Sequence, residues 1–177
     1  MIYVVMGVCG SGKTTIGTAL AEKLGLPFRD ADEFHSMENK KKMSQGIALT
    51  DQDRRPWLLA IYKYMRRLSK EGNSGVVTCS ALRKSYRDIL VNGCISEERE
   101  PIPEIVFVLL HGSRAVLQNR LDSRSGHFMP TSLLDSQLAT LEIPTSDEKC
   151  VQVDISMSPD KVMDQIIERT RTIAIKS

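Results

Sequence analysis

The chain has 177 residues, of which 41% are hydrophobic and 26% charged, the composition of an ordinary globular protein of about one domain. Its 24 Lys and Arg residues nearly balance its 22 Asp and Glu residues, and the formal charge of +2 excludes a strongly basic nucleic-acid coat protein. No apolar run approaches the roughly 18 residues of a membrane-spanning helix. We therefore expect one domain over residues 1–177, with neither a nucleic acid nor a membrane as partner.

Apolar, β-branched runs alternate with amphipathic helical patterns along the whole chain. The predicted order is strand 2–6, helix 13–24, strand 27–29, helices 36–44 and 51–70, strand 75–79, helix 83–90, strand 105–110, helices 113–123 and 132–141, strand 151–155 and a last helix from Pro159. Asp51 is the expected cap of the long helix. This alternation predicts an α/β fold with a parallel sheet covered on both faces. Ligands of such sheets bind at the carboxyl ends of the strands.

The first strand leads into a segment that matches the phosphate-binding pattern G-x-x-x-x-G-K-[ST] at every position. It reads Gly7-Val8-Cys9-Gly10-Ser11-Gly12-Lys13-Thr14. The glycines let consecutive backbone N–H groups point inward as an anion nest, and the following helix adds its positive N-terminus. We expect Lys13 to reach the β- and γ-phosphates of ATP and the Thr14 hydroxyl to bind Mg²⁺. Cys9 suits a tight turn as a small residue, and a redox role is the alternative.

Two carboxylates, Asp30 and Asp32, follow the second predicted strand. In an extended segment, side chains two residues apart face the same side. This spacing suits one carboxylate near a metal ion and one that accepts a proton from a substrate hydroxyl. The alternative is a pair of solvated acids that cap the next helix. His35 follows closely and, taken alone, fits a core or surface position as well as a substrate contact.

The segment Thr50–Trp57 is dense in charge and ends in the only tryptophan of the chain. Arg54 can hold a small carboxylate in a bidentate fork, or it can pair with Asp51 three residues earlier. Trp57, by itself, is a core residue. Ser80 follows the third strand at the height where ligands bind, so its hydroxyl is a candidate for contact with substrate hydroxyls.

Two further arginines, Arg120 and Arg124, lie four residues apart, just before Gly126 and His127. Arginines on a closing loop can exclude water and stabilise the charge of a transferring phosphoryl group. A solvated basic helix face is the alternative for the same pattern.

Taken together, these motifs resemble the P-loop (thermoresistant) gluconokinases, relatives of shikimate kinase. The resemblance rests on Gly7–Thr14, Asp30-Ala31-Asp32 with His35, Asn39 with Lys42-Met43, Asp51-x-Asp53-Arg54-x-Pro56-Trp57, Cys79-Ser80-Ala81-Leu82-x-Lys84-x-Tyr86-Arg87-Asp88, and Gly126-His127-Phe128. It covers residues 1–144 and continues weakly to the last helix. It implies a three-layer P-loop kinase sandwich with five parallel strands and a mobile lid over residues 120–132. It also implies ATP-dependent phosphorylation of D-gluconate to 6-phosphogluconate and, commonly, a homodimer.

The resemblance also assigns roles to residues by position. Lys13, Asp32, Arg120 and Arg124 would be catalytic, and Asp32 would be the base. The nucleotide would be held by Gly7, Val8, Cys9, Gly10, Ser11, Gly12, Lys13, Thr14, Thr15, Arg120 and Arg124, and the metal by Thr14 and Asp30. The substrate would be bound by Asp32, His35, Arg54, Trp57, Ser80, Lys84, Arg87 and His127. Departures from the family, such as Cys9 for serine and Leu138-Ala139 for Phe-Glu, remove no chemical group assigned here.

Two other functions remain open on the sequence alone. A shikimate or nucleoside monophosphate type of kinase would share the phosphate loop and the Asp pair, although the Thr50–Trp57 segment speaks against a different acceptor. A nucleotide-dependent switch would use only the phosphate loop. The four cysteines are scattered without a CxxC pair, and no signal peptide precedes the first strand, so we expect reduced thiols and a cytoplasmic location.

Overall fold

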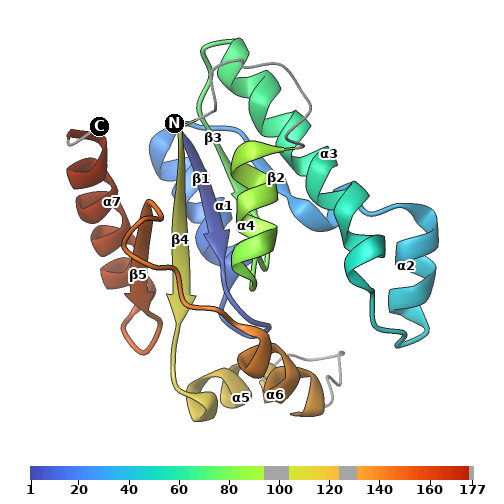
Figure 1. The fold of residues 1–177 in the computed structure, drawn as a ribbon. Helices are drawn as coiled ribbons and strands as arrows, with labels where there is room; N and C mark the ends of the chain where they lie inside the picture. Colours follow the sequence, from blue (N-terminus) through green and yellow to red (C-terminus); the bar gives the residue numbers. More distant parts are fainter. Residues whose placement is uncertain (94–103, 124–130, 176–177) are drawn as a thin grey trace.

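The computed structural model describes residues 1–93, 104–123 and 131–175, and its centre is one sheet of five parallel strands in the order β2-β3-β1-β4-β5 (Figure 1). The strands are β1 (Ile2–Met6), β2 (Phe28–Asp30), β3 (Gly75–Thr78), β4 (Ile105–His111) and β5 (Cys150–Asp154). The helices are α1 (Lys13–Leu24), the 3₁₀ turn η1 (Ala31–Phe34), α2 (Met37–Ser44), α3 (Asp51–Lys70), α4 (Lys84–Asn92), α5 (Arg114–Asp122), α6 (Thr131–Thr140) and α7 (Pro159–Ile175). The predicted α/β class and parallel sheet are confirmed.

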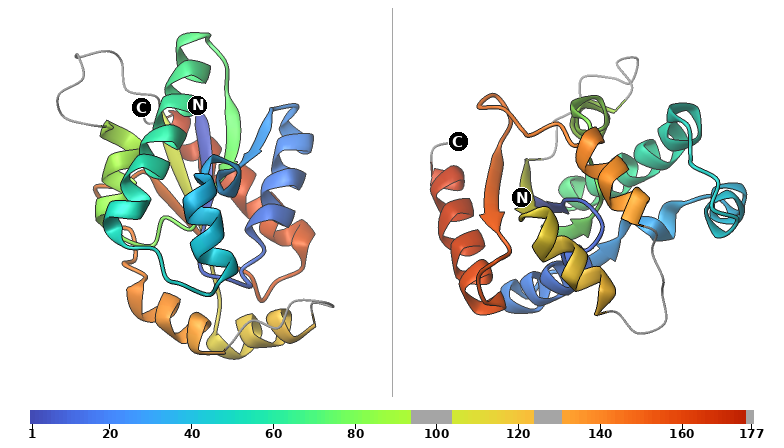
Figure 2. Two further views of the ribbon diagram at one scale, coloured as in Figure 1. Left: turned by 90° about the vertical axis from the view of Figure 1, so that its right-hand side faces the viewer. Right: turned by 90° about the horizontal axis from the view of Figure 1, so that it is seen from below.

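Helices cover both faces of the sheet because the central strands are apolar on both faces. In β1, Val5 joins a buried cluster with residues of α1 and α7, whereas its neighbours Val4 and Met6 join a second cluster with residues of α3 and α4. The alternation follows from the two-residue period of side chains along a strand. Figures 1 and 2 show α1 and α7 on one side of the sheet and α3 and α4 on the other.

Most predicted elements agree with the structure to within two residues, and two local features differ. The prediction that Asp51 caps the long helix is wrong: the cap is Thr50, whose side chain accepts from the Asp53 amide while the Asp53 carboxylate accepts from the Thr50 amide. This reciprocal pair satisfies N–H groups that the first helical turn leaves unpaired. The turn η1 was not predicted, because four residues are too few to show a helical period.

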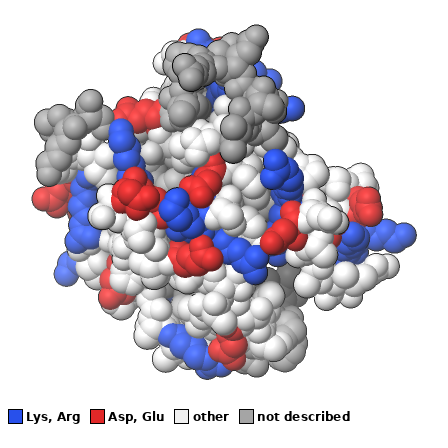
Figure 3. All heavy atoms as spheres, in the orientation of Figure 1, with Lys and Arg blue, Asp and Glu red and all other residues white. Residues whose placement is uncertain are grey.

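The carboxyl ends of β1 and β4 point toward α5 and α6, which lie below the sheet in Figure 1 and side by side in both views of Figure 2. Helix α2 stands out from the body beside α3. Acidic and basic side chains are interspersed on the face shown in Figure 3, in keeping with the near balance of charges in the sequence. None of the described helices combines the length and the apolar character that crossing a membrane requires.

Candidate active site

The segment Gly7–Thr14 forms the turn between β1 and α1, at the carboxyl edge of the sheet. Gly7 has a φ of 143°, and a Cβ atom at this position would lie 2.6 Å from the carbonyl oxygen of Leu110 on β4. Only glycine fits here, because the loop passes directly over the neighbouring strand. Gly12, in the left-handed conformation with a φ of 90°, is the N-cap of α1, so the amides that begin this helix face the loop. The loop therefore has the shape and polarity of an anion-binding nest.

Lys13 and Thr14, at the start of α1, donate hydrogen bonds to different acceptors. The Lys13 ammonium donates to the Val8 carbonyl at 3.0 Å, so the side chain curls back over the loop. Burial lowers the pKa of Lys13, whereas the nearby carboxylates of Asp32 and Asp30 act to raise it. The Thr14 hydroxyl donates to Asp30 Oδ2 at 3.1 Å. Thr14 and Asp30 thus present hard oxygen donors together, which is the ligand type that Mg²⁺ prefers.

The carboxylates of Asp30 and Asp32 differ in the hydrogen bonds that they accept. Asp30 Oδ1 accepts the Asp32 amide at 3.0 Å and caps η1, which is the capping role that the sequence left open. The same carboxylate also accepts the Thr14 hydroxyl through Oδ2. Asp32 is exposed, and its carboxylate accepts no hydrogen bond from the residues that the structure describes. It is therefore available to a ligand at the edge of the sheet.

The turn that carries Asp32 is held against α3 by Trp57. The Trp57 indole N–H donates to the Ala31 carbonyl at 2.7 Å, and the ring of His35 stacks on the indole at 4.3 Å with an interplanar angle of 10°. Trp57 is only 4% exposed, so it supports the turn from inside the core. His35 is also buried, and this burial lowers its pKa, an effect that Asp32 opposes and Arg54 adds to. The lowered pKa of His35 favours its uncharged form, and its Nδ1 has no partner in the described part of the chain.

Cys79, which directly follows β3, is buried, and this burial raises the pKa of its thiol to about 12. The charge of Asp32 also raises this pKa, whereas the charges of Lys13 and Arg54 lower it. These effects agree with a lysine from the phosphate loop, an acid from η1 and an arginine from α3 on the same side of the sheet. Of the side chains that the structure describes, no three His, Cys, Asp or Glu residues form a group that could hold a metal ion.

Arg54 lies in the first turns of α3, and of its guanidinium nitrogens only Nε donates a hydrogen bond to a described residue. Its Nε donates to the Leu49 carbonyl at 3.4 Å, and its Cζ lies 5.8 Å from the centre of the Tyr86 ring. Asp51, the alternative partner in the sequence analysis, instead accepts from Arg83 at 3.0 Å and from the Tyr86 hydroxyl. Among the described residues nothing accepts a hydrogen bond from the two Nη groups of Arg54, which matches a fork kept for a ligand.

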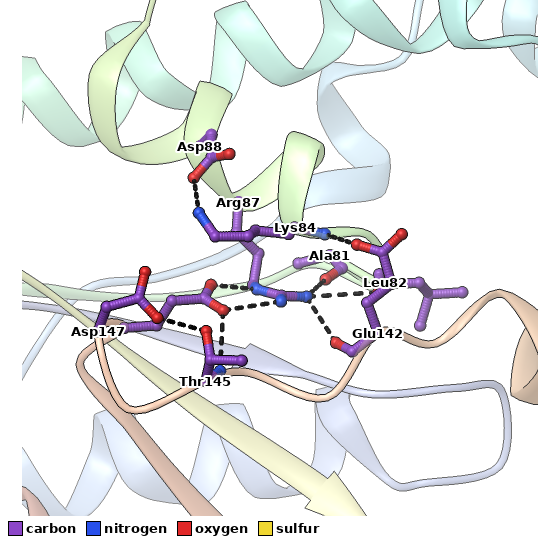
Figure 4. A network of polar contacts seen from close by, with 9 residues as sticks. Ala81, Leu82, Lys84, Arg87, Asp88, Glu142, Thr145 and Asp147 are labelled. Carbon is purple, nitrogen blue, oxygen red and sulfur yellow. Dashed lines mark hydrogen bonds and ion pairs between the residues drawn. The ribbon is translucent and has the colours of Figure 1, made fainter.

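Two predicted substrate residues on α4 are engaged elsewhere. The Lys84 ammonium pairs with Asp88 at 2.9 Å, one helical turn along. Arg87 is 1% exposed and its guanidinium donates to Glu148 and to three backbone carbonyls (Figure 4). These contacts favour a role for Arg87 in supporting the substrate pocket over the predicted direct contact with the substrate.

The remaining predicted residues divide into those near the phosphate loop and those outside the described ranges. Arg120 is partly buried and donates to the Ser11 carbonyl at 3.4 Å and to the Ile155 carbonyl at 2.7 Å, so it is not part of a solvated basic face. Thr15 is exposed in the first turn of α1. Ser80 is half-buried, and its carbonyl accepts the Gly7 amide at 3.4 Å. Arg124 and His127 lie outside the described residues, as does most of the predicted lid over residues 120–132.

The comparisons with known proteins agree with this arrangement. The family model of shikimate kinase matches residues 9–171. A probable gluconokinase of Xenopus tropicalis is 45% identical, over 94% of this chain and 91% of its own length. The gluconokinase of Gluconobacter oxydans is 46% identical, over 93% of this chain and 88% of its own length. The chain belongs to the gluconokinases of the shikimate kinase-like family. The predicted family is thereby confirmed.

A solved structure supports the same assignment of fold. The crystal structure of a gluconokinase from Sinorhizobium meliloti superposes on this chain with a TM-score of 0.84 at 44% identity, and the match covers 98% of this chain and 93% of the other. The P-loop kinase fold expected from the motifs is therefore confirmed for this gluconokinase. Its phosphate loop follows β1 and its Asp pair stands at the end of β2, at the edge of the sheet where we expected ligands to bind, and Arg54 lies in the first turns of α3.

Sequence reasoning missed several residues that complete the site of this gluconokinase. Gln137 of α6 accepts the Cys9 amide at 2.7 Å and fixes the phosphate loop from the side. Glu142 and Glu148, in the connection from α6 to β5, bind the end of β3 and Arg87. These residues lie in no recognisable chemical motif, and only their tertiary contacts single them out.

Proposed function

We propose that this gluconokinase transfers the γ-phosphoryl group of ATP to the terminal hydroxyl of D-gluconate, with release of ADP and 6-phospho-D-gluconate. The observation that carries the proposal is the phosphate loop with Lys13 and with Thr14 bonded to Asp30, next to the exposed and unpartnered carboxylate of Asp32. Arg54 adds two Nη groups with no described acceptor. A phosphate-binding cation, an unoccupied carboxylate and an arginine with free donors at one edge of the sheet are the groups that a sugar-acid kinase needs.

On the nucleotide side, the amides of Gly7–Thr14 and the N-terminus of α1 would bind the phosphates, and Lys13 would leave the Val8 carbonyl to reach them. Thr14 and Asp30 are the residues that would hold Mg²⁺, and their paired oxygens suit it. When bound, the ion neutralises charge on the phosphates. Arg120 already contacts the carbonyl of Ser11 and is positioned beside the same loop. Thr15 and Arg124 complete the proposed nucleotide set.

On the acceptor side, the substrate hydroxyl would give its proton to Asp32, whose carboxylate is exposed and without a described partner. Arg54 would bind the gluconate carboxylate through its two Nη groups. Neutral His35 and Ser80 would contact sugar hydroxyls, with Lys84 and His127 as further predicted contacts. Trp57 would act by fixing the Asp32 turn.

The organisation of the protein in the cell extends the same proposal. We propose one kinase domain over residues 1–177, a lid formed by residues 120–132, a homodimer and a cytoplasmic location. The two buried clusters share one sheet, which supports a single domain. The described cysteines, Cys9, Cys79 and Cys150, form no disulfide, which is in keeping with a reducing compartment.

The proposed reaction is tested by measuring ADP release with gluconate, shikimate, AMP or no acceptor, together with detection of the phosphorylated product. We expect ADP release that depends on gluconate and yields 6-phosphogluconate. Activity only with AMP would replace gluconate by a nucleotide acceptor. Nucleotide binding without any acceptor-dependent release would instead identify a switch protein.

A further inference from the structure

Arg87 is the most completely buried charged side chain that the structure describes, and it lies behind the acceptor site. Its Nε and Nη2 donate to the two oxygens of Glu148 at 2.5 and 3.0 Å, which is a bidentate fork. Its Nη1 donates to the carbonyls of Ala81 at 3.1 Å, Leu82 at 3.3 Å and Glu142 at 3.0 Å (Figure 4). One side chain therefore ties three carbonyls from two segments far apart in the sequence to a buried carboxylate.

One of these carbonyls belongs to a residue in an unfavourable backbone conformation. Ala81 has a φ of 44° and is the one non-glycine residue with a positive φ among those that the structure describes. A Cβ-bearing residue in this region is strained and is held there by its surroundings. Ala81 directly follows Ser80, whose carbonyl accepts the Gly7 amide of the phosphate loop. The conformation of Ala81 thus sets where Ser80 lies relative to that loop.

The other segment held by Arg87 follows α6. Glu142 contacts the connection from β3 to α4 through its backbone and its side chain. Its amide donates to the Leu82 carbonyl at 2.8 Å, and its carboxylate accepts the amide of Lys84, the first residue of α4, at 2.6 Å. In the preceding helix, Gln137 accepts the Cys9 amide in the phosphate loop. Helix α6 and the connection that follows it therefore contact both the phosphate loop and residues 82–84.

Glu148 is itself held in place, so it can orient Arg87. It is 9% exposed in its side chain, and its Oε1 accepts the Thr145 amide at 3.2 Å while its own amide donates to the Thr145 carbonyl at 3.0 Å. Arg114 and Asp135 form a fork of the same geometry, at 2.6 and 2.9 Å, but both side chains are about half exposed and touch no backbone carbonyl of the acceptor site. The exposed Arg114–Asp135 pair is therefore a matched control for the Arg87–Glu148 pair.

We propose that Arg87 and Glu148 are positioning residues for gluconate, which act by holding Ala81 in its left-handed conformation and so fixing Ser80 beside the phosphate loop. The inference rests on the proposed function and deepens it on the acceptor side. Neither residue reaches the reacting atoms, because both are buried behind the strand end. The pair acts on the substrate only through the backbone of residues 80–82.

The test compares Glu148→Gln, Ala81→Gly and the double variant with the exposed control Asp135→Asn. Glu148→Gln keeps the size of the side chain but weakens the fork, and we expect the KM for gluconate to rise about 10- to 100-fold, with the KM for ATP nearly unchanged. Glycine adopts a positive φ without strain. Ala81→Gly alone should therefore leave the KM for gluconate unchanged, and in the double variant it should restore most of the loss. Asp135→Asn should change neither KM.

Folding is checked in each variant by thermal unfolding and by the fluorescence of Trp57, the only tryptophan. If Glu148→Gln is too unstable to assay, Arg87→Lys keeps the charge, loses the fork and should give the same KM split and the same rescue. Equal rises in both KM values, or no rescue by Ala81→Gly, overturn the proposal and leave the pair a purely structural one. A wild-type chain inactive on gluconate but active on another acceptor overturns the proposed function, and this inference with it.

Discussion

Most of the proposed phosphate side comes from one stretch of chain, Gly7–Thr15, to which β2 adds Asp30 and α5 adds Arg120. The proposed acceptor side, in contrast, takes Asp32 from η1, Arg54 from α3 and Ser80 from the segment after β3. Phosphate groups are the same in every nucleotide, so a fixed backbone nest can bind them. A sugar acid needs a carboxylate site and a base at a set separation, which only packing between distant elements can provide.

The difference predicts that substitutions on the two sides separate the kinetic parameters for ATP and for gluconate. Lys13→Met should have the largest effect, because it removes a charge-stabilising contact to the transferring group. We expect kcat to fall on the order of 10²–10³-fold, as measured by ADP release at saturating gluconate. Lys23→Met, at the other end of α1 and paired with Asp164 on the surface, is the control and should retain full activity. Near-normal turnover of Lys13→Met would remove this residue from the mechanism.

Arg54→Ala, on the acceptor side, should affect the KM for gluconate and not the KM for ATP. Losing a charge-assisted fork costs roughly 1.5–3 kcal/mol, so the KM for gluconate should rise about 10- to 100-fold while the KM for ATP changes little. Arg67→Ala, in the last turn of the same helix and with its guanidinium over the Tyr64 ring, should change neither KM. Equal rises in both KM values for Arg54→Ala would exclude a carboxylate contact.

Trp57→Phe should have a smaller effect, because it keeps an aromatic ring against His35 and removes only the hydrogen bond to the Ala31 carbonyl. We expect a loss of about 1 kcal/mol in the free energy of unfolding. The turn that carries Asp32 should loosen, so kcat should fall several-fold with little change in the KM for ATP. Denaturant unfolding and steady-state kinetics measure the two effects, and an unchanged kcat would make Trp57 a core residue only.

The smallest expected effect is on thermal stability at low pH, through Asp53 in the first turn of α3. The Lys42 ammonium at 2.8 Å, and then the Thr50 amide, lower the pKa of Asp53 to about 2 from its ordinary 3.8. A carboxyl with a lowered pKa stabilises the fold above its unfolded pKa, and the contribution is lost as pH falls from about 4 toward 2. The melting temperatures of wild type and Asp53→Asn should therefore differ at pH 7 and converge near pH 2. A difference that is independent of pH would show that the charge of Asp53 contributes nothing to stability.

The motifs predicted the fold class and the order of the elements well, because these depend on local patterns. A period of two residues gives a strand, and G-x-x-x-x-G-K-[ST] gives a nest wherever a strand precedes it and a helix follows. The acceptor half of the site stays a prediction. Arg54 and Arg87 were both expected to serve the substrate, yet the two Nη groups of Arg54 have no described acceptor whereas Arg87 is buried. A charged residue next to a motif gives no sign of whether it faces the ligand or the core.

The sequence by itself determined that this chain folds as a parallel α/β protein with a phosphate loop after its first strand, since strand, turn and helix signals there lie within a few residues of one another. The tertiary structure alone decided which of the many charged residues face the acceptor, which of them support it, and that Glu148 holds Arg87 behind Ala81. The reason is physical. Burial and pairing are set by elements that meet across the fold, and no short window of sequence contains both partners.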